Sequence, residues 1–268
     1  MHAGRSGGPR TRKIPVMSES PHVIVGVSAG VCEVRLNRPD KRNAITLEMY
    51  RALTNAVHTA NVDDDVRVIL FSGEGASFTA GNDLNDFLSG PPLGEDHDAA
   101  RFIRTLPAIR KVTLAAVHGS TVGIGVTLLL HCDLVLAARG ARLSMPFVKL
   151  GLVPEAASSL LLPRLVGHQR AAELLLLGTS IDAARAFEIG IVNRVVDDEA
   201  LTSEARALAR TVAQQPPGAL LATRRLLRSG STTVLNRIEE ELEAFREQLG
   251  SSEFRAAAQD FFNKRRGG

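Results

Sequence analysis

The sequence is poor in several residue types that mark particular classes of protein. Its 268 residues include no tryptophan, one tyrosine and two cysteines, Cys32 and Cys132. So few large aromatic rings argue against a surface that stacks on nucleic-acid bases, although ten phenylalanines keep this argument modest. Neither cysteine has the spacing of a metal site or of a short-loop disulfide framework. We therefore expect no metal and a reducing, cytoplasmic setting.

Long apolar runs and a strong net charge are also lacking. No apolar run reaches 18 residues, and the N-terminus has no hydrophobic centre of a signal peptide, so no membrane partner is expected. The formal net charge is only +3 and the excess lies mainly in the two tails, so a nucleic-acid partner is not expected either. A hydrophobic content of 44% predicts a globular protein of one large domain, or a domain with an appendage.

The chain divides into three regions by composition. Residues 1–20 are rich in Gly, Pro, Ser and Arg without apolar periodicity, which predicts a disordered leader. In residues 21–199 strands alternate with helices, which predicts an α/β domain with crossover connections. Residues 200–268 are almost wholly helical. In the last long helix an apolar stripe lies opposite a run of glutamates, a pattern that suits docking on a partner surface: Val234, Ile238, Leu242, Phe245 and Leu249.

Periodicity and breaker residues place the individual elements. Strands are predicted at 22–27, 30–37, 66–73, 112–119 and 133–138. Helices are predicted at 46–62, where Thr46 is a plausible cap, and at 99–110 and 123–131. Further helices are predicted at 156–165, 168–177, 182–188, 200–214, 217–229, 233–249 and 252–263.

Two glycine-rich loops follow two of these strands. "FSGEGASFTAGNDLNDF" (71–87) and "HGSTVGIGVTLLLHCD" (118–133) each run from a strand through glycines into a helix. Glycine permits positive φ angles and close backbone approach, so both loops can present free N–H groups. Either loop alone could be an ordinary turn, but together they form a candidate oxyanion hole.

Five segments in order then resemble the enoyl-CoA hydratase/isomerase, or crotonase, family. They are "LNRPDKRNAIT" (36–46), "SFTAGNDL" (77–84), "GSTVGIGVTLLLHCDLVLAA" (119–138), "LGLVPEAASSLLLPRLVG" (150–167) and "LLLLGTSIDAARAFEIGIVNRVV" (174–196). The resemblance covers about residues 22–264. It implies an α/β fold built as a spiral of ββα units with a helical C-terminal trimerisation region, and hence a homotrimer or hexamer.

The same resemblance implies an acyl-CoA thioester substrate and no separate cofactor, since coenzyme A is part of the substrate. The thioester carbonyl would lie between two backbone N–H groups, those of Asn82 after Gly81 and of Ile124 after Gly123. The coenzyme end would contact Lys41 and Arg42 through its phosphates, although both could instead be solvated surface charges. Other positions matched to the coenzyme are Ala44, Ala80, Asp83, Leu84, Phe262 and Lys264, the last two often reaching a neighbouring subunit.

Two positions depart from the hydratases of this family. Those enzymes add water with two glutamates, and the matching positions here are Thr127 and Phe147, which we expect to line the substrate instead. Neither side chain can act as a general base. Between Asp133 and Glu173 the only carboxylate is Glu155, in "LVPEAAS", where some isomerases of the family have their single catalytic glutamate.

Glu155 is therefore the predicted base for shifting a 3-enoyl-CoA double bond to the 2 position, in fatty acid or related acyl-CoA catabolism. Apolar neighbours should raise its pKa. The alternative for this residue is a charge in the first turn of a helix. Alternatives for the protein are an enoyl-CoA hydratase, a non-catalytic acyl-CoA-binding member, or an RNA-binding role resting on the basic tails. His118 and His131 are expected to be structural.

Overall fold

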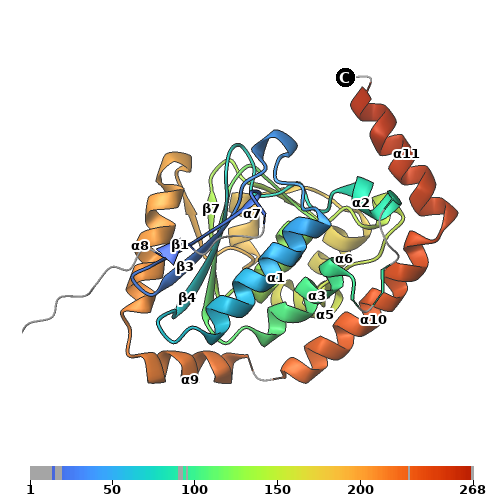
Figure 1. Cartoon of the computed structure of the whole chain (residues 1–268). Coiled ribbons are helices and arrows are strands. Elements are labelled where there is room, and N and C mark those ends of the chain that lie inside the picture. The colour runs from blue at the N-terminus through green and yellow to red at the C-terminus, as the bar shows by residue number, and fades with distance from the viewer. Residues whose placement is uncertain (1–13, 16–19, 90–92, 95, 229, 267–268) are drawn as a thin grey trace, which may run out of the picture.

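A seven-stranded sheet forms the middle layer of the structure (Figure 1). The computed structural model describes residues 14–15, 20–89, 93–94, 96–228 and 230–266. Most of the predicted leader lies outside these ranges, and residues 14–15 pair with the next strand. The sheet has the order β1-β2-β3-β4-β5-β7-β10. The strands are β1 (Ile14–Pro15), β2 (Val23–Ser28), β3 (Val31–Leu36), β4 (Val68–Gly73), β5 (Val112–Val117), β7 (Leu134–Ala138) and β10 (Arg194–Val196).

The sheet begins as a hairpin and continues as a parallel sheet. β2 and β3 are antiparallel, and the turn between them has positive φ angles at Ala29 (50°) and Gly30 (79°). From β3 to β10 every neighbouring pair is parallel. Such strands need crossover connections and are covered on both faces, which explains why all six residues of β5 are buried. The predicted hairpin and α/β class are confirmed.

Helices cover the two faces of the sheet (Figure 1). α8 (Leu201–Ala213) packs on one face through Ala205 and Ala209. α1 (Leu47–Val62) and α3 (Asp98–Thr105) belong to the larger core on the other face. The Thr46 hydroxyl accepts a hydrogen bond from Met49 N at 3.2 Å, as predicted for the start of α1.

Three short strands form a second sheet that the sequence did not reveal. β6 (Ser120–Val122), β8 (Arg142–Ser144) and β9 (Ile181–Asp182) pair in that spatial order beside the main sheet. After β6 the chain enters α4 (Ile124–Thr127) and then one 3-10 turn, so the helix expected at 123–131 is two short pieces. The other helices are α2 (Leu84–Ser89), α5 (Ser158–Val166), α6 (His168–Leu176), α7 (Ala183–Glu188), α9 (Pro217–Leu227), α10 (Ser231–Leu249) and α11 (Ser252–Arg266).

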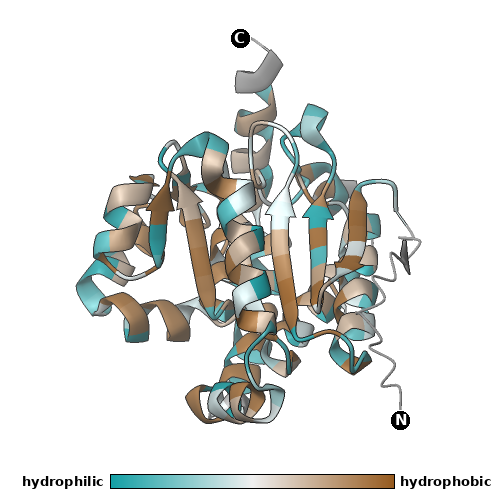
Figure 2. Cartoon of the chain, turned by 90° about the vertical axis from the view of Figure 1, so that its left-hand side faces the viewer, coloured by the Kyte–Doolittle hydropathy of each residue, from teal (hydrophilic) through white to brown (hydrophobic). Residues whose placement is uncertain are grey.

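The C-terminal helices wrap around the core. α9 lies at the lower edge, α10 crosses beside α3 and α5, and α11 extends upward as an arm that ends above the core (Figures 1 and 2). Ile238, Leu242 and Phe245 of α10 are buried in the larger core. The expectation that this stripe docks on a partner surface is therefore wrong, because the chain's own core covers it. No described helix is long and apolar enough to cross a membrane.

Candidate active site

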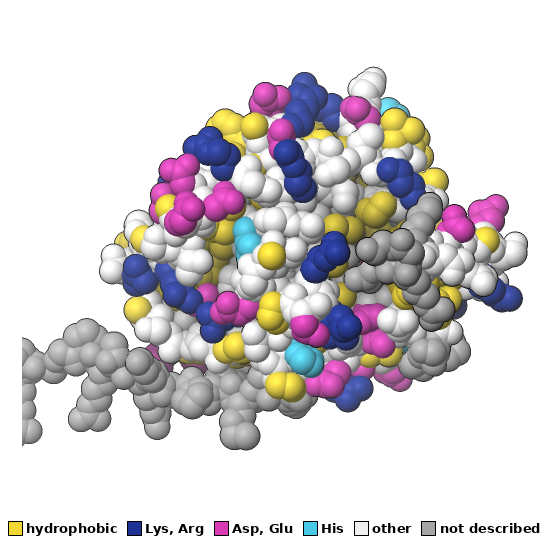
Figure 3. Space-filling model, turned by 90° about the horizontal axis from the view of Figure 1, so that it is seen from above, with side chains coloured by type: hydrophobic (Ala, Val, Ile, Leu, Met, Phe, Trp, Pro, Cys, Tyr) yellow, Lys and Arg dark blue, Asp and Glu magenta, His cyan; other side chains and the backbone are white. Residues whose placement is uncertain are grey.

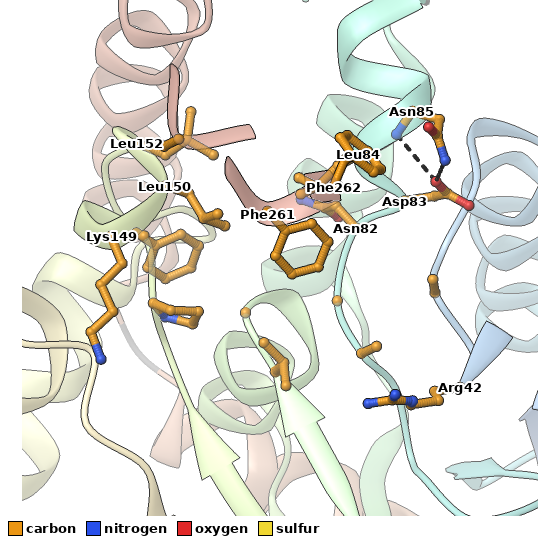
Figure 4. Close-up of a pocket in the computed structure, with 18 of the residues that line it drawn as sticks. Arg42, Asn82, Asp83, Leu84, Asn85, Lys149, Leu150, Leu152, Phe261 and Phe262 are labelled. Atoms are coloured by element: carbon orange, nitrogen blue, oxygen red, sulfur yellow. Dashed lines mark hydrogen bonds between the residues drawn. The ribbon is translucent and has the colours of Figure 1, made fainter. Parts of the chain in front are cut away.

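A pocket of about 1000 Å³ opens between the loop after β4, β6 with the glycine that follows it, and α11 (Figure 4). Most residues that we matched to the substrate line it: Lys41, Arg42, Ala44, Ala80, Gly81, Asn82, Asp83, Leu84, Gly123, Phe147 and Phe262. Phe262 reaches it from the same chain. Ile124, Thr127 and Glu155 are buried and do not line it. The side chain of Lys264 lies outside the part of the chain that the structure describes.

The two glycine-rich loops lie directly against each other. Val122 N donates to Thr79 O at 3.0 Å, and Thr79 N donates to Ser120 O at 3.2 Å. Gly81 has a φ of 88°, and a Cβ added there would be 3.0 Å from Val122 O. Glycine thus allows both the left-handed conformation and the close approach that bring the loops together.

Two backbone N–H groups are available where the loops meet. Within the described ranges, neither Asn82 N nor Ile124 N donates to a backbone oxygen, whereas Asp83 N donates to Ile45 O and Gly123 N donates to Ser144 O, both at 2.9 Å. Ile124 is the first residue of α4 and follows Gly123, whose φ is 56°. Two unpaired donors on adjacent loops are the arrangement that an oxyanion hole requires.

A network of hydrogen bonds fixes the segment that carries Lys41 and Arg42 at the pocket. Arg42 and Asn43 both have left-handed backbones, with φ angles of 50° and 54°. The buried Asn43 side chain accepts from Arg38 N at 2.7 Å and donates to the Glu74 and Ser77 carbonyls, both at 2.8 Å. This segment is therefore anchored to the loop after β4, and the Arg42 side chain stays exposed.

Arg38 is a pocket residue that sequence reasoning missed. Its guanidinium donates to Asp83 Oδ2 at 2.7 Å and to Ala44 O at 3.0 Å, and both partners of the ion pair are mostly buried. Burial opposes ionisation of Asp83, but hydrogen bonds from Arg38 and Asn85 hold its pKa below the ordinary value. Asp83 and Asn85 are joined in Figure 4. The motif matched Asp83 to the coenzyme without revealing its cationic partner.

Glu155 is buried, with only 4% of its surface exposed. The hydroxyl of Tyr50, the only tyrosine, donates to Asn82 Oδ1, and the Asn82 side chain also hydrogen-bonds to Glu155. Among the described side chains, none makes a hydrogen bond to Glu155 Oε1. Burial, and next the negative charge of Glu241, raise the pKa of Glu155 to about 8, while the Asn82 hydrogen bond opposes the rise.

Glu241 of α10 is a second buried carboxylate, which sequence reasoning did not connect with this site. It is 6% exposed, and it accepts hydrogen bonds from Ala157 N at 2.5 Å and from Ser159 N at 2.9 Å. Burial raises its pKa to about 7, against the effect of these bonds. Of the two residues that the motifs matched to hydratase glutamates, Thr127 is fully buried and Phe147 is an apolar wall residue of the pocket.

The two histidines near the site bind backbone carbonyls. His131 Nε2 donates to Ala156 O at 2.7 Å, and burial lowers the pKa of His131 to about 4, so its ring is neutral. His118 Nε2 is 2.9 Å from Gly75 O. These contacts agree with the predicted structural roles. In the described part of the chain, no group of three or more His, Cys, Asp or Glu side chains could hold a metal ion.

The charge on the upper face of the molecule, as oriented in Figure 1, is mixed. Figure 3 shows lysine and arginine side chains dispersed over this face, with acidic side chains between them. Among the side chains drawn in colour there, they form no continuous basic patch. A few separate cations near a pocket mouth suit an anionic small molecule better than the extended track of a nucleic acid.

The parallel sheet, the helical C-terminal arm and the two free N–H groups on adjacent loops define a protein of the crotonase fold class. Comparisons with known proteins agree. The model of the family described as "Enoyl-CoA hydratase/isomerase" matches residues 26–267. The chain therefore belongs to the enoyl-CoA hydratase/isomerase family, as its motifs predicted. Similar proteins are named as isomerases, hydratases and dehalogenases of coenzyme A thioesters.

Two proteins of similar sequence and one solved structure show how similar the chain is to known members of the family. The 1,2-epoxyphenylacetyl-CoA isomerase of Escherichia coli is 36% identical over 91% of this chain and 96% of its own length. The enoyl-CoA delta isomerase 2 of Rattus norvegicus is 35% identical over 83% of this chain and 58% of its own length. The structure of OdaA from Pseudomonas aeruginosa is 42% identical, with a TM-score of 0.88, and the match covers 90% of this chain and 99% of that one.

Proposed function

We propose that this protein shifts the double bond of a 3-enoyl-CoA to the 2 position, with Glu155 as the single acid–base group. One observation carries the proposal: Glu155 is a buried carboxylate with an unpaired oxygen, hydrogen-bonded to the Asn82 side chain at the oxyanion loops. Thr127 and Phe147 at the hydratase positions argue against two-carboxylate water addition. The similar enoyl-CoA delta isomerase 2 of Rattus norvegicus also supports it.

The reaction needs one group that carries a proton between two carbons. The Glu155 carboxylate takes a proton from C2, and the electron pair of that C–H bond spreads over the former C3–C4 double bond and the thioester as a dienolate. The N–H groups of Asn82 and Ile124 donate to its oxygen, and losing one such donor typically costs about 3 kcal/mol of transition-state stabilisation. The neutral Glu155 acid then returns the proton to C4. The product double bond lies between C2 and C3, and no water or redox partner is consumed.

The raised pKa suits this exchange. A carboxylate with a pKa of about 8 holds a proton more strongly than an ordinary glutamate, so it is a better base for a weakly acidic C–H group. The same burial keeps water away from the dienolate. The Arg38–Asp83 pair and the exposed Lys41 and Arg42 would hold the coenzyme so that its thioester reaches the two N–H donors.

Turnover of two isomeric thioesters tests the function directly. The purified protein is given 3-hexenoyl-CoA and, separately, 2-hexenoyl-CoA, and the products are separated by chromatography. We expect 2-hexenoyl-CoA from the first substrate and very little 3-hydroxyhexanoyl-CoA from the second. Glu155→Gln should abolish isomerisation, and Glu155→Asp should retain part of it. Hydration at a rate comparable with isomerisation, or full activity of the Gln variant, would overturn the proposal, and binding of both thioesters without any turnover would make this chain a non-catalytic member.

A further inference from the structure

The turn that carries Glu155 has a conformation that its own residues do not favour. Ala156 and Ala157 follow Glu155 directly, and both have left-handed backbones, with φ angles of 57° and 56°. For a residue with a Cβ this conformation costs about 1 kcal/mol or more. Two such residues in succession persist only where the surrounding structure holds them.

Glu241 holds one side of this turn. One oxygen of its carboxylate accepts from Ala157 N at 2.5 Å, and the other accepts from Ser159 N at 2.9 Å and Ser159 Oγ at 2.6 Å. Its charge thus binds the turn and the first residues of α5 through three hydrogen bonds. On the other side, His131 donates to Ala156 O at 2.7 Å.

Glu241 belongs to the same C-terminal segment that forms a wall of the pocket. Phe245, one turn further along α10, lines the pocket, as do Phe261 and Phe262 of α11 (Figure 4). Glu241 itself does not line it. A single rigid helix therefore contacts the substrate pocket at one turn and the Glu155 turn at the preceding one.

We propose that Glu241 is a positioning residue for the base: it holds the Glu155 turn so that the unpaired Glu155 oxygen stays directed at the reacting carbons. This inference rests on the function proposed above. Because α10 also carries a pocket wall residue, docking of the C-terminal helices and orientation of the base are coupled through Glu241. A misplacement of about 1 Å at a reacting group can cost on the order of a hundredfold in rate.

Charge gives this position a second, measurable effect. The Glu241 carboxylate is, after burial, the main influence that raises the pKa of Glu155. Arg237, on the preceding turn of α10, lowers the pKa of Glu241, and the Tyr50 hydroxyl donates to Asn82, whose side chain also bonds to Glu155. His131, on the far side of the turn, is neutral. Removing the Glu241 charge should therefore lower the pKa of Glu155.

The test compares Glu241→Gln with Glu243→Gln, a matched change on α10 whose side chain is 64% exposed and pairs with Arg246. For Glu241→Gln we expect kcat for 3-hexenoyl-CoA to fall about tenfold to a hundredfold while KM stays within about threefold. The rising limb of its kcat/KM profile should move to lower pH. Glu243→Gln should match the wild type. An unchanged kcat, or a loss confined to KM, overturns the inference.

Two further variants keep the test decisive. Ser159→Ala removes one of the three bonds to Glu241 and should lower kcat about threefold, so it replaces Glu241→Gln if that variant fails to fold, and an unchanged kcat would then overturn the inference. Glu155→Gln is measured alongside. If it retains full activity, the proposed function itself fails. If it is inactive while Glu241→Gln keeps the wild-type kcat and pH profile, only the positioning role fails.

Discussion

Replacing Glu155 by glutamine tests both the chemistry and the electrostatics of the site. Glutamine has nearly the same shape but cannot take up a proton as a base. General acid–base catalysis contributes about a hundredfold to ten-thousandfold, so we expect kcat to fall about a thousandfold. Because glutamine keeps the size and shape of the side chain, KM should change little. The same substitution should make the folded protein more stable.

The stability effect follows from the raised pKa. Burial moves the pKa of Glu155 from its ordinary 4.5 to about 8, so the folded state binds this proton more tightly than the unfolded state. Stability is then lost as pH rises from about 4.5 to about 8. At 1.36 kcal/mol per pKa unit, the full loss is about 5 kcal/mol, and about 3 kcal/mol of it is present at pH 7. The glutamine variant is neutral at every pH and avoids this loss.

Urea unfolding at pH 5, 7 and 9 measures the difference. The stability advantage of Glu155→Gln over the wild type should be about 1 kcal/mol at pH 5 and grow to about 5 kcal/mol at pH 9. Glu243→Gln, which changes an exposed glutamate, should show no such growth. A variant that is less stable than the wild type at pH 9, or a difference that does not vary with pH, would refute the reasoning that Glu155 is costly to ionise.

Two other variants test the residues that only the structure revealed. Arg38→Ala removes the partner of Asp83 and the bond to Ala44 O, so KM for the thioester should rise about tenfold with little change in kcat; steady-state kinetics decide, and an unchanged KM would contradict the role at the coenzyme end. Tyr50→Phe keeps the ring packed against Phe102 but removes the hydrogen bond to the Asn82 amide oxygen. We expect kcat to fall about fivefold and the free energy of unfolding to fall by about 1 kcal/mol. Wild-type kcat in this variant would show that the hydroxyl does not orient Asn82.

Local patterns predicted the longer elements well. The β2–β3 hairpin and α1 with its Thr46 cap depend on alternation, helical spacing and capping chemistry within a few residues. The short strands β6, β8, β9 and β10 escaped prediction, because two or three residues show no clear alternation and are strands only through their distant partners. The apolar stripe of α10 was read correctly as a stripe, but its partner is the chain's own core.

The amino-acid sequence by itself determined the family and the two glycine-rich loops, since both depend on residue identity at given spacings. It also predicted Thr127 and Phe147 at the positions of the hydratase glutamates. The tertiary structure alone decided which charges meet. It brought Arg38 to Asp83 and Glu241 to the turn after Glu155, from distant parts of the chain. Burial and the distance between charges set the pKa of Glu155, and both arise only when the chain packs.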